Sequence, residues 1–272
     1  MNNNPKVTIL MPVHNGEATI KKAIKSTLKQ SFQNFEFIII DDGSTDNTAN
    51  IVKKNAETNK KIIYIKNETN LGIQKSLNKG LKIATGKYIA RIDDDDEWCE
   101  NDKLKKQVEF LDNNSNYAIV GTGIIVVNEN SKELFRFLNP TEDVIIRKKI
   151  LSANCFSHPS VLMRKSMLLA VNGYSETNKC FYVEDYDLWL KLGTVGKFAN
   201  LSIFGLKYTI SKNQISTLHK IKQLKTNFYL IKKYKKFYPH YYIALLRACL
   251  RLLVYGYFNF QYLSKITAKF KQ

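Results

Sequence analysis

Short apolar runs alternate with segments of helical periodicity over the first ninety residues of the chain. The runs are continuously apolar, as expected for strands covered on both faces of a sheet, and they lie at 7–11, 35–40, 62–65 and 88–92. Between them apolar residues recur every three to four positions, for example at Ile20, Ala23 and Ile24, which predicts amphipathic helices. This alternation indicates right-handed strand–helix–strand units and an α/β fold with a mainly parallel sheet flanked by helices.

The pattern becomes mixed after residue 96. The elements predicted there are helices at 104–111 and 184–192, strands at 117–127 and 198–210, and a loop followed by a strand at 154–164. From about Lys212 onward the chain is basic and shows helical spacing. A soft boundary is therefore expected near residue 211, between an α/β domain and a helical C-terminal segment.

Polar residues follow three of the predicted strands at the points where those strands end. His14 and Asn15 follow the first strand, Asp41 and Asp42 follow the second, and a run of four aspartates follows the fourth. Parallel strands place their carboxyl ends at one edge of a sheet, which is where ligands bind in such folds. The three clusters are therefore expected to converge on a single crevice.

The run from Asp93 to Asp96 has two interpretations. Most acidic runs are solvated loops or helix starts. The alternative is a site for a hard divalent cation, Mg²⁺ or Mn²⁺, because four ionised carboxylates repel one another strongly in a buried place without a cation. The position of the run, directly after a buried strand and beside Asp42, favours the cation site, at which a substrate diphosphate would also be neutralised.

The charge of the chain is strongly basic and unevenly distributed. The formal net charge is +18, and 26 of the 42 Lys and Arg lie in residues 1–187 together with all 24 Asp and Glu. Residues 188–272 hold the other 16 basic residues and no acidic one. A near-neutral part is thus joined to a cationic part, which suggests contact with a polyanion such as an anionic membrane leaflet or a nucleic acid.

Other features indicate an ordinary globular protein of a reducing compartment. Apolar residues make up 44% of the chain, enough for a sizeable core. The cysteines fit no disulfide or metal pattern and are Cys99, Cys155, Cys180 and Cys249. The polar N-terminus predicts no signal peptide, and Arg247 and Arg251 interrupt the most apolar stretch, at 241–260. We expect a cytoplasmic protein without a membrane-spanning helix, located peripherally at the inner face of the membrane.

Several phrases of the chain resemble family 2 glycosyltransferases with the GT-A fold. They are ILMPVHNG at 9–16, IDDGSTD at 40–46 and ARIDDDD at 90–96, with the linking phrases NLG at 70–72, LNKG at 77–80 and ATGKYI at 84–89. The match is specific over roughly 6–112 and continues more loosely to about 195, through HPSV at 158–161 and EDYDLW at 184–189. The segment 99–104 departs from the family, because it is one residue longer than usual and lacks the common proline.

The resemblance implies a donor-binding role for the strand ends. The residues that would contact the nucleotide part of the donor are Pro12, His14, Asn15, Glu17, Asn70 and Lys75. Asp42 would hydrogen-bond the base, usually uracil. Asp93-X-Asp95 matches the metal motif of the family, with Asp95 as the direct ligand and Asp93 near the metal and the ribose or phosphate. Asp94 would touch the nucleotide, and Asp96 would cap the turn that follows.

Sugar transfer requires a base that takes the proton of the acceptor hydroxyl as its oxygen attacks the anomeric carbon. Glu184 and Asp185 stand at the start of a predicted helix, where the helix dipole alone also favours acidic residues. The resemblance places a Glu-Asp pair here and uses its Asp as the base, so Asp185 is the predicted base with Glu184 beside it. His158 is a second candidate near the acceptor, although a histidine before proline is more often structural.

The basic C-terminal segment is predicted to form two amphipathic helices. Ile221, Leu224, Phe228 and Ile231 recur at helical spacing among lysines, and a second helix with a broad apolar face starts at about Pro239. Such helices suit the headgroup region of an anionic membrane. They equally suit a hairpin packed on the catalytic domain, and both can hold. A specific nucleic-acid partner is not expected, because no recognition motif is present.

The resemblance implies an inverting glycosyltransferase that depends on Mn²⁺ or Mg²⁺ and moves a hexose or N-acetylhexosamine from a UDP-sugar to a glycan. The acceptor is expected to be lipid-linked and to belong to a surface polysaccharide such as O-antigen or capsule. The predicted GT-A catalytic domain is 1–211, with a donor half at about 1–112 and an acceptor half at about 113–211. The basic amphipathic extension is 212–272.

Two alternatives remain open at the level of sequence. A nucleotidyltransferase also places carboxylates at the ends of parallel strands, but it should show a glycine- and lysine-rich phosphate loop, which the segment 12–16 does not resemble. The second alternative is a non-catalytic membrane- or nucleic-acid-binding protein on a transferase fold. The presence of Asp42, Asp93, Asp95 and Asp185 argues against it.

Overall fold

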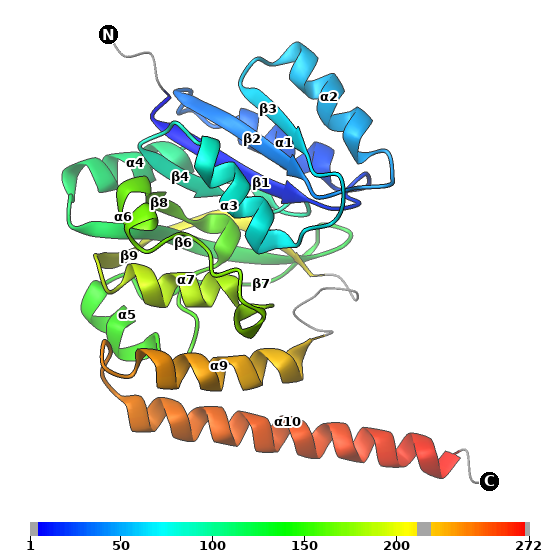
Figure 1. The fold of residues 1–272 in the computed structure, drawn as a ribbon, viewed down its shortest axis with the longest axis vertical. Coiled ribbons are helices and arrows are strands. Elements are labelled where there is room, and N and C mark those ends of the chain that lie inside the picture. The colour runs from blue at the N-terminus through cyan, green and yellow to red at the C-terminus, as the bar shows by residue number, and fades with distance from the viewer. Residues whose placement is uncertain (1–4, 211–218, 270–272) are drawn as a thin grey trace.

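A nine-stranded mixed sheet with helices on both faces forms the centre of the molecule (Figure 1). The structure is a computed structural model that describes residues 5–210 and 219–269, without the side chains of residues 178 and 256–269. The strand order is β3-β2-β1-β4-β8-β6-β9-β5, and β7 pairs with β6 outside this path. The predicted α/β class is confirmed.

The N-terminal half of the sheet is wholly parallel, as predicted. Its strands are β1 (Val7–Val13), β2 (Phe35–Asp41), β3 (Ile62–Lys66) and β4 (Tyr88–Arg91), and the connecting helices are α1 (Ile20–Leu28), α2 (Thr48–Thr58) and α3 (Ile73–Ile83). After β3 the chain crosses over to place β4 on the other side of β1. The strand order therefore reverses between β1 and β4, and ligands bind at such a switch point in open α/β sheets.

The second half of the sheet is mixed, because β8 runs antiparallel to both β4 and β6, while β6 and β9 are parallel. The strands are β5 (Glu97–Trp98), β6 (Tyr117–Asn128), β7 (Glu133–Phe137), β8 (Leu162–Arg164) and β9 (Lys197–Ile210), and the helices are α4 (Lys103–Asn113), α5 (Asp143–Lys149), α6 (Lys165–Ala170) and α7 (Glu184–Leu192). The predicted elements at 104–111, 117–127, 184–192 and 198–210 are confirmed. The short elements β5, β7, α5 and α6 were not predicted.

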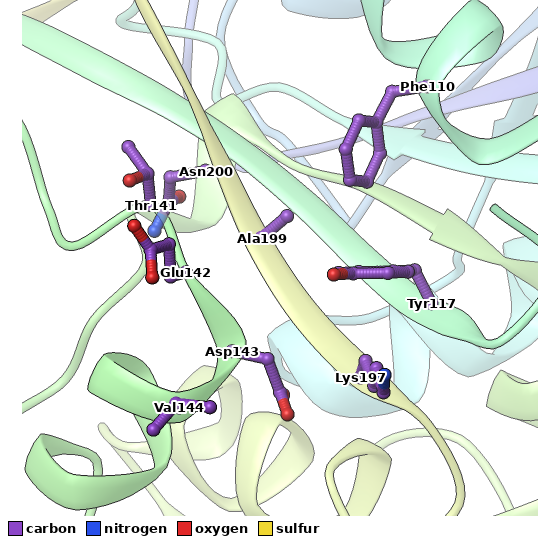
Figure 2. Close-up of a pocket in the computed structure, with 9 residues that line it drawn as sticks. All are labelled: Phe110, Tyr117, Thr141, Glu142, Asp143, Val144, Lys197, Ala199 and Asn200. Atoms are coloured by element: carbon purple, nitrogen blue, oxygen red, sulfur yellow. The ribbon is translucent and has the colours of Figure 1, made fainter. Parts of the chain in front are cut away.

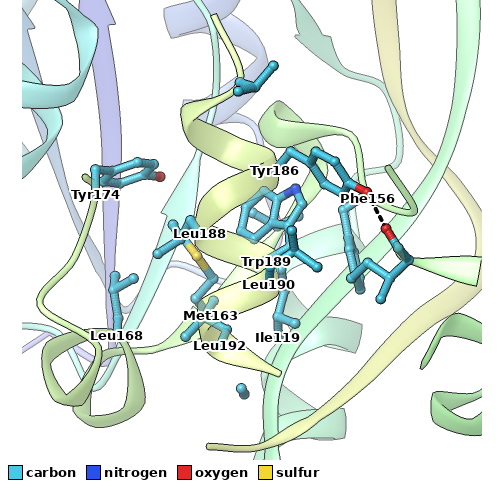
Figure 3. Packing of buried hydrophobic residues seen from close by; sticks show 14 of the residues in the cluster. Ile119, Phe156, Met163, Leu168, Tyr174, Tyr186, Leu188, Trp189, Leu190 and Leu192 are labelled. Atoms are coloured by element: carbon cyan, nitrogen blue, oxygen red, sulfur yellow. Dashed lines mark hydrogen bonds between the residues drawn. The ribbon is translucent and has the colours of Figure 1, made fainter. Parts of the chain in front are cut away.

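The core lies in two clusters, one on each face of the sheet. Successive residues of β1 alternate between them, since Leu10 belongs to one cluster and Ile9 and Met11 belong to the other. The cluster that contains Leu10 also holds the apolar side of α7, shown in Figure 3, where the Tyr186 hydroxyl donates a hydrogen bond to the Ile150 carbonyl. This packing fixes the position of α7 relative to the sheet.

Two C-terminal helices, α9 (Lys220–Tyr234) and α10 (Tyr241–Lys269), confirm the helical prediction for this part of the chain. We call them the C-terminal helical pair. Figure 1 shows α9 between α7 and α10, with α10 outermost. Buried residues of both helices, including Leu230, Ile231 and Ala244, join the cluster around α7, so the predicted packing of a hairpin on the domain is confirmed.

The boundary predicted near residue 211, and the first residues of the predicted extension, lie outside the described residues. The division of the chain at this point stays a prediction. Among the helices that the structure describes, none combines the length and apolarity needed to cross a membrane.

Candidate active site

The turn after β1 is held against the turn after β2. His14 Nδ1 lies 2.9 Å from the carbonyl oxygen of Asp42, and the backbone N–H of Thr45 donates to Asn15 Oδ1 over 2.9 Å. The backbone N–H of Asn47 donates to Glu17 Oε2, also over 2.9 Å. His14, Asn15 and Glu17 are exposed beyond the end of β1, whereas Pro12 is buried within the strand. The structure thus brings these predicted donor-binding residues together at the carboxyl edge of the sheet.

Asp42 is buried, and its carboxylate anchors the loop that follows β3. Asn67 Nδ2 and the backbone N–H of Leu71 donate to Oδ1, each over 2.8 Å, and the backbone N–H of Gly72 donates to Oδ2 over 2.9 Å. Asn70 also accepts from the N–H of Gly72, over 3.0 Å. Asp42 therefore shapes the loop that carries Asn70, and its predicted hydrogen bond to a nucleobase stays a prediction.

Lys75 lies in the first turn of α3, and its side chain is exposed. Its predicted role in donor binding therefore stays a prediction, on a helix that starts from the loop held by Asp42.

The aspartate run begins at the end of β4 and is packed beneath the turn after β1. Thr19 donates a hydrogen bond to Asp94 Oδ2 over 2.9 Å. A Cβ atom placed on Gly16 would lie 2.5 Å from the same oxygen and 2.6 Å from Val13 Cγ2, so only glycine fits there without displacement. Asp94 is turned toward α1, and its predicted contact with the nucleotide stays a prediction.

Three members of the run form a set of oxygen donors that suits a hard cation. Oxygen atoms of Asp93, Asp95 and Asp96 all lie within 4.8 Å of one another. Burial, followed by the negative charge of Asp93, raises the pKa of Asp94 to about 6 and that of Asp95 to about 7. The same causes hold the pKa of Asp96 well above its usual range. Negative charge is therefore undercompensated at this point, and a divalent cation would supply the missing positive charge.

Asp96 takes part in this cluster more directly than the sequence suggested. Its Oδ1 accepts a hydrogen bond from the backbone N–H of Thr209 over 3.1 Å, while its Oδ2 is buried and lacks a hydrogen-bond donor. A buried carboxylate oxygen without a donor is costly, and coordination of a cation removes that cost. Asp96 fits as a third ligand beside the predicted Asp93 and Asp95. Sequence spacing gave no sign of this, because the contact comes from β9.

The predicted catalytic base, Asp185, and its neighbour Glu184 lie at the N-terminus of α7. Asn154 Nδ2 donates to Asp185 Oδ2 over 2.8 Å, and Glu184 Oε2 is buried without a donor. Burial, followed by the charge of Asp185, raises the pKa of Glu184 to about 7. Burial also raises the pKa of Asp185, against the opposing effect of hydrogen bonds from the Tyr186 backbone and Asn154. A carboxylate with a raised pKa, oriented by one hydrogen bond, is suited to accept a proton.

His158 is buried in the short 3₁₀ turn His158–Ser160. Its Nε2 lies 2.7 Å from the hydroxyl of Tyr174, and its ring packs against Trp189 with centroids 5.6 Å apart. Burial, followed by the charge of Arg91, holds the pKa of His158 well below its usual range, so the ring is neutral. These surroundings favour the structural alternative for His158, and its catalytic role stays a prediction.

Arg91, the last residue of β4, links the two groups of acids. Its side chain is only 1% exposed, and its guanidinium pairs with Asp93. The charge of Arg91 partly opposes the rise that burial causes in the pKa of Asp95 on one side and of Glu184 and Asp185 on the other, and Asp93 in turn acts on Glu184. The cluster of aspartates and the two acids at the start of α7, Glu184 and Asp185, thus share one site. The sequence analysis missed Arg91, although a basic residue within a buried strand is itself an uncommon signal.

A separate cavity of about 430 Å³ lies between β9, the start of α5 and the end of α4 (Figure 2). Its lining includes Tyr117, Glu142, Lys197 and Asn200, and none of the predicted donor-binding or catalytic residues. This cavity is therefore separate from the predicted donor site.

Comparison with known proteins agrees with this site. The family model described as glycosyl transferase family 2 matches residues 8–170. Over 192 residues the chain is 39% identical to a Bacillus subtilis protein named as a glycosyltransferase, EpsE, covering 70% of this chain and 68% of that protein. Over 221 residues it is 33% identical to Escherichia coli UDP-Glc:alpha-D-GlcNAc-diphosphoundecaprenol beta-1,3-glucosyltransferase WfgD, covering 80% and 82%. The chain belongs to glycosyltransferase family 2.

Solved structures identify the fold. Staphylococcus aureus TarS in complex with UDP-GlcNAc has a TM-score of 0.66 at 23% identity, covering 83% of this chain and 66% of that one. The mannosyltransferase PcManGT from Pyrobaculum calidifontis, in complex with GDP-Man and Mn²⁺, has a TM-score of 0.69 at 17% identity, covering 93% and 75%. The GT-A fold expected from the sequence is confirmed. The family assignment also argues against the nucleotidyltransferase alternative.

Proposed function

We propose that this chain is an inverting glycosyltransferase that uses Mn²⁺ or Mg²⁺ and moves a hexose or an N-acetylhexosamine from a UDP-sugar to a glycan acceptor. The observation that supports this most strongly is the meeting of two acidic groups in one site. Asp93, Asp95 and Asp96 lie at the end of β4, Glu184 and Asp185 lie at the start of α7, and the charge of one buried arginine acts on both groups.

The first acidic group suits the donor diphosphate. Asp95, Asp93 and Asp96 would hold the cation, whose positive charge, when bound, neutralises the diphosphate and makes the nucleotide a better leaving group. Arg91 holds Asp93 in place through their ion pair. The residues that would bind the nucleotide part of the donor are Pro12, His14, Asn15, Glu17, Asp42, Asn70, Lys75 and Asp94.

The second acidic group suits the acceptor. Asp185 would take the proton from the attacking hydroxyl, with one of its oxygens oriented by Asn154. Glu184 stands beside it, with a pKa raised to about 7 by burial and by the charge of Asp185. Attack from the face opposite the diphosphate in a single displacement inverts the configuration at the anomeric carbon.

The relatives support the donor and the acceptor class. WfgD is named for a UDP-glucose donor and a diphosphoundecaprenol-linked acceptor, and TarS has been solved with UDP-GlcNAc. We therefore infer a UDP-sugar donor and a lipid-linked glycan acceptor in the synthesis of a bacterial surface polysaccharide, such as O-antigen or capsule. PcManGT, which binds GDP-Man, is the reason for testing guanine nucleotides as well.

A lipid-linked acceptor agrees with the exposed face of α10. Tyr242, Leu246 and Leu253 are 82%, 60% and 69% exposed, and they lie opposite Ala244 and Ala248, which pack on the domain. The part of the chain from residue 188 onward carries basic and no acidic residues. We propose that this apolar face enters the headgroup region of an anionic membrane, so that the enzyme works peripherally at the cytoplasmic face.

Substitution of the proposed base tests the reaction. Asp185→Asn should lower transfer by at least about 1,000-fold, because the amide cannot accept the proton, while UDP binding in the presence of Mn²⁺ stays within about twofold of wild type. Calorimetry with UDP and with GDP, each with and without Mn²⁺, measures binding, and radiolabelled sugar transfer measures turnover. Near-wild-type turnover in Asp185→Asn would contradict the assignment of the base. Absence of metal-dependent nucleotide binding in the wild type would support the non-catalytic alternative.

A further inference from the structure

The C-terminal helical pair contacts the chain on both sides of Glu184 and Asp185. On the downstream side the contact is made by Asp187, which is in the first turn of α7 and is fully buried. Lys233 Nζ and the Tyr234 hydroxyl, both from the last turn of α9, donate to Asp187 Oδ1 over 2.9 Å each. Ser175 donates to the other oxygen. The helix that carries the proposed base is thus tied to α9 through a buried carboxylate.

This contact needs α9 in order to be stable. Burial alone would raise the pKa of Asp187, but hydrogen bonds from Ser175, Lys233 and Tyr234, together with the charge of Lys233, hold that pKa below its usual value. Asp187 is therefore ionised inside the protein, and its compensating cation comes from α9. Displacement of α9 would leave an unpaired charge two residues from Asp185, which is a strongly unfavourable arrangement.

On the upstream side the contact is made by Tyr182, two residues before Glu184. Tyr182 has a φ angle of +70°, a left-handed conformation that a residue with a side chain adopts only when its surroundings enforce it. Gln223 Nε2 of α9 donates to the Tyr182 carbonyl over 3.1 Å, and the His219 ring stacks on the Tyr182 ring with centroids 4.0 Å apart. The start of α9 thus holds the strained residue that directs the chain into α7.

A third contact with α7 comes from the segment that connects α9 to α10, and it lies further from the proposed catalytic residues. The Tyr238 hydroxyl donates to the Leu190 carbonyl over 2.7 Å, near the C-terminal end of α7. Tyr234 and Tyr238 are 5% and 4% exposed, so they are nearly equal in burial and each gives one hydrogen bond to α7. They differ in which end of α7 they hold. This difference separates a role in positioning the first turn from a general contribution to stability.

We propose that α9 is a positioning element of the active site. Its contacts with Asp187 and Tyr182 fix the first turn of α7, and with it the direction of the Glu184 and Asp185 carboxylates toward the acceptor. Lys233, Tyr234 and Gln223 are positioning residues that act through Asp187 and Tyr182 without touching the substrate. The proposal rests on the proposed function, and it makes the helical pair a required part of the catalytic unit and not an appendage to it.

A matched pair of tyrosine substitutions in the full-length protein tests this role. Tyr234→Phe should lower kcat by about tenfold or more, because small misplacements of a catalytic group have large effects on rate. The donor KM and the affinity for UDP with Mn²⁺ should stay within about twofold of wild type, since the donor residues lie on other elements. Tyr238→Phe should lower the melting temperature to a similar degree but keep kcat within about twofold.

Substitutions of Lys233 provide a second comparison. Lys233→Met should lower kcat in the same manner, and Lys233→Arg, which keeps the cation, should restore most of the rate. If Lys233→Met does not fold, the tyrosine pair still decides the question. Equal kcat in Tyr234→Phe and Tyr238→Phe, beside an active wild type, would overturn the positioning role. A wild type without nucleotide-sugar transfer would instead overturn the proposed function, and the positioning role with it.

Discussion

Acidic side chains in this site are held close to one another, and the buried side chain of Arg91 lies among them. Arg91 pairs with Asp93, and its charge also acts on Glu184 and Asp185. One cation cannot neutralise all of these carboxylates. Burial, followed by the remaining repulsion between them, therefore raises the pKa of Asp95 and of Glu184 to about 7 each. At the scale of the residue, the site is built to receive further positive charge and to accept a proton.

Glu184 gives this chain a testable dependence of stability on pH. Its pKa is about 7 in the folded protein against 4.5 for an ordinary glutamate, so the folded state retains a proton that the unfolded state loses first. The free energy of unfolding therefore falls as the pH rises from about 4.5 to about 7. Glu184→Gln should flatten this fall and stabilise the metal-free protein by about 1–3 kcal/mol at pH 8, with no gain at low pH.

Thermal unfolding in EDTA at pH 5 and pH 8 measures the effect of Glu184→Gln. Glu129→Gln, at an exposed position, is the matched control and should leave the pH dependence of wild type unchanged. The same loss of stability with rising pH in Glu184→Gln and wild type would show that Glu184 does not keep its proton in the folded state.

Asp96 gives a second prediction at this scale. Asp96→Asn keeps an oxygen for the Thr209 N–H but removes the negative charge of the buried, donor-free Oδ2. Binding of Mn²⁺ in the presence of UDP should weaken by about 10–100-fold, while the metal-free protein should unfold at an equal or higher temperature. Calorimetry measures the binding of Mn²⁺ to the wild type and to Asp96→Asn. The control is Glu100→Gln, from the neighbouring loop. Unchanged Mn²⁺ affinity would exclude Asp96 from the cation site.

At the scale of the element, close approach of the turn after β1 to the aspartate run sets the geometry of the proposed donor-binding side of the site. The turn is fixed to the turn after β2 by hydrogen bonds of Asn15, and to Asp94 by Thr19. Gly16 is required because the space for a Cβ atom is filled by Asp94 and Val13. Two segments far apart in sequence thus share one small volume, at the point where the strand order reverses.

Gly16→Ala tests this close approach. The new methyl group must displace either Asp94 or the turn, so we expect a loss of stability of about 1–3 kcal/mol and weaker UDP binding, by roughly tenfold. Ala18→Ser, at an exposed position of the same turn, is the control and should change neither quantity measurably. Chemical denaturation and calorimetry measure the two effects. A stable Gly16→Ala protein with wild-type affinity for UDP would show that the turn tolerates the shift.

At the scale of the whole molecule, the basic charge and the catalytic site belong to one packed body. The helical pair contributes Leu230, Ile231 and Tyr234 to the core around α7, and Arg251 donates to the Ser152 carbonyl, near the loop that carries Asn154. The opposite side of α10 presents apolar side chains to solvent. A surface that docks on a membrane would therefore lie on the same packed unit as the proposed base.

Membrane docking is tested with the full-length chain, because removal of the helical pair would expose the core around α7. Leu246→Ser combined with Leu253→Ser should reduce flotation with anionic phosphatidylglycerol vesicles by about tenfold, since both leucines are exposed on α10. Binding should also fall at high salt and with neutral phosphatidylcholine vesicles.

The matched control for docking is the pair Leu134→Ser and Leu169→Ser, which removes leucines of 52% and 49% exposure from β7 and α6. These variants should float like wild type. Equal flotation of the α10 variants and the wild type would contradict docking through this face. Concentration-dependent dimerisation lost only in the α10 variants would instead show that a second copy of the chain covers the face.

Local patterns in the sequence were sufficient to predict much of the fold of this protein. The parallel strands read as continuous apolar runs because both of their faces are buried, and the bounds predicted for α7 agree with the structure because its apolar spacing is regular. The motifs at the ends of β1, β2 and β4 identified the family, the fold and residues that lie together at the carboxyl edge of the sheet. The short elements β5 and β7 were missed because two to five residues, exposed throughout in β7, form strands only through pairing with distant partners.

The tertiary structure alone decided which side chains act on one another. Arg91 stands two residues before Asp93 in sequence, but its effect on Glu184 depends on the fold, which brings the start of α7 near the end of β4. Asp96 faces the β9 backbone, and Asp187 meets Lys233 and Tyr234 from a helix that sequence analysis treated as a separate extension. Secondary structure and strand-end motifs are local properties that a pattern can show. Burial, charge compensation and the placement of the base arise from contacts between distant segments, and only the folded chain brings those together.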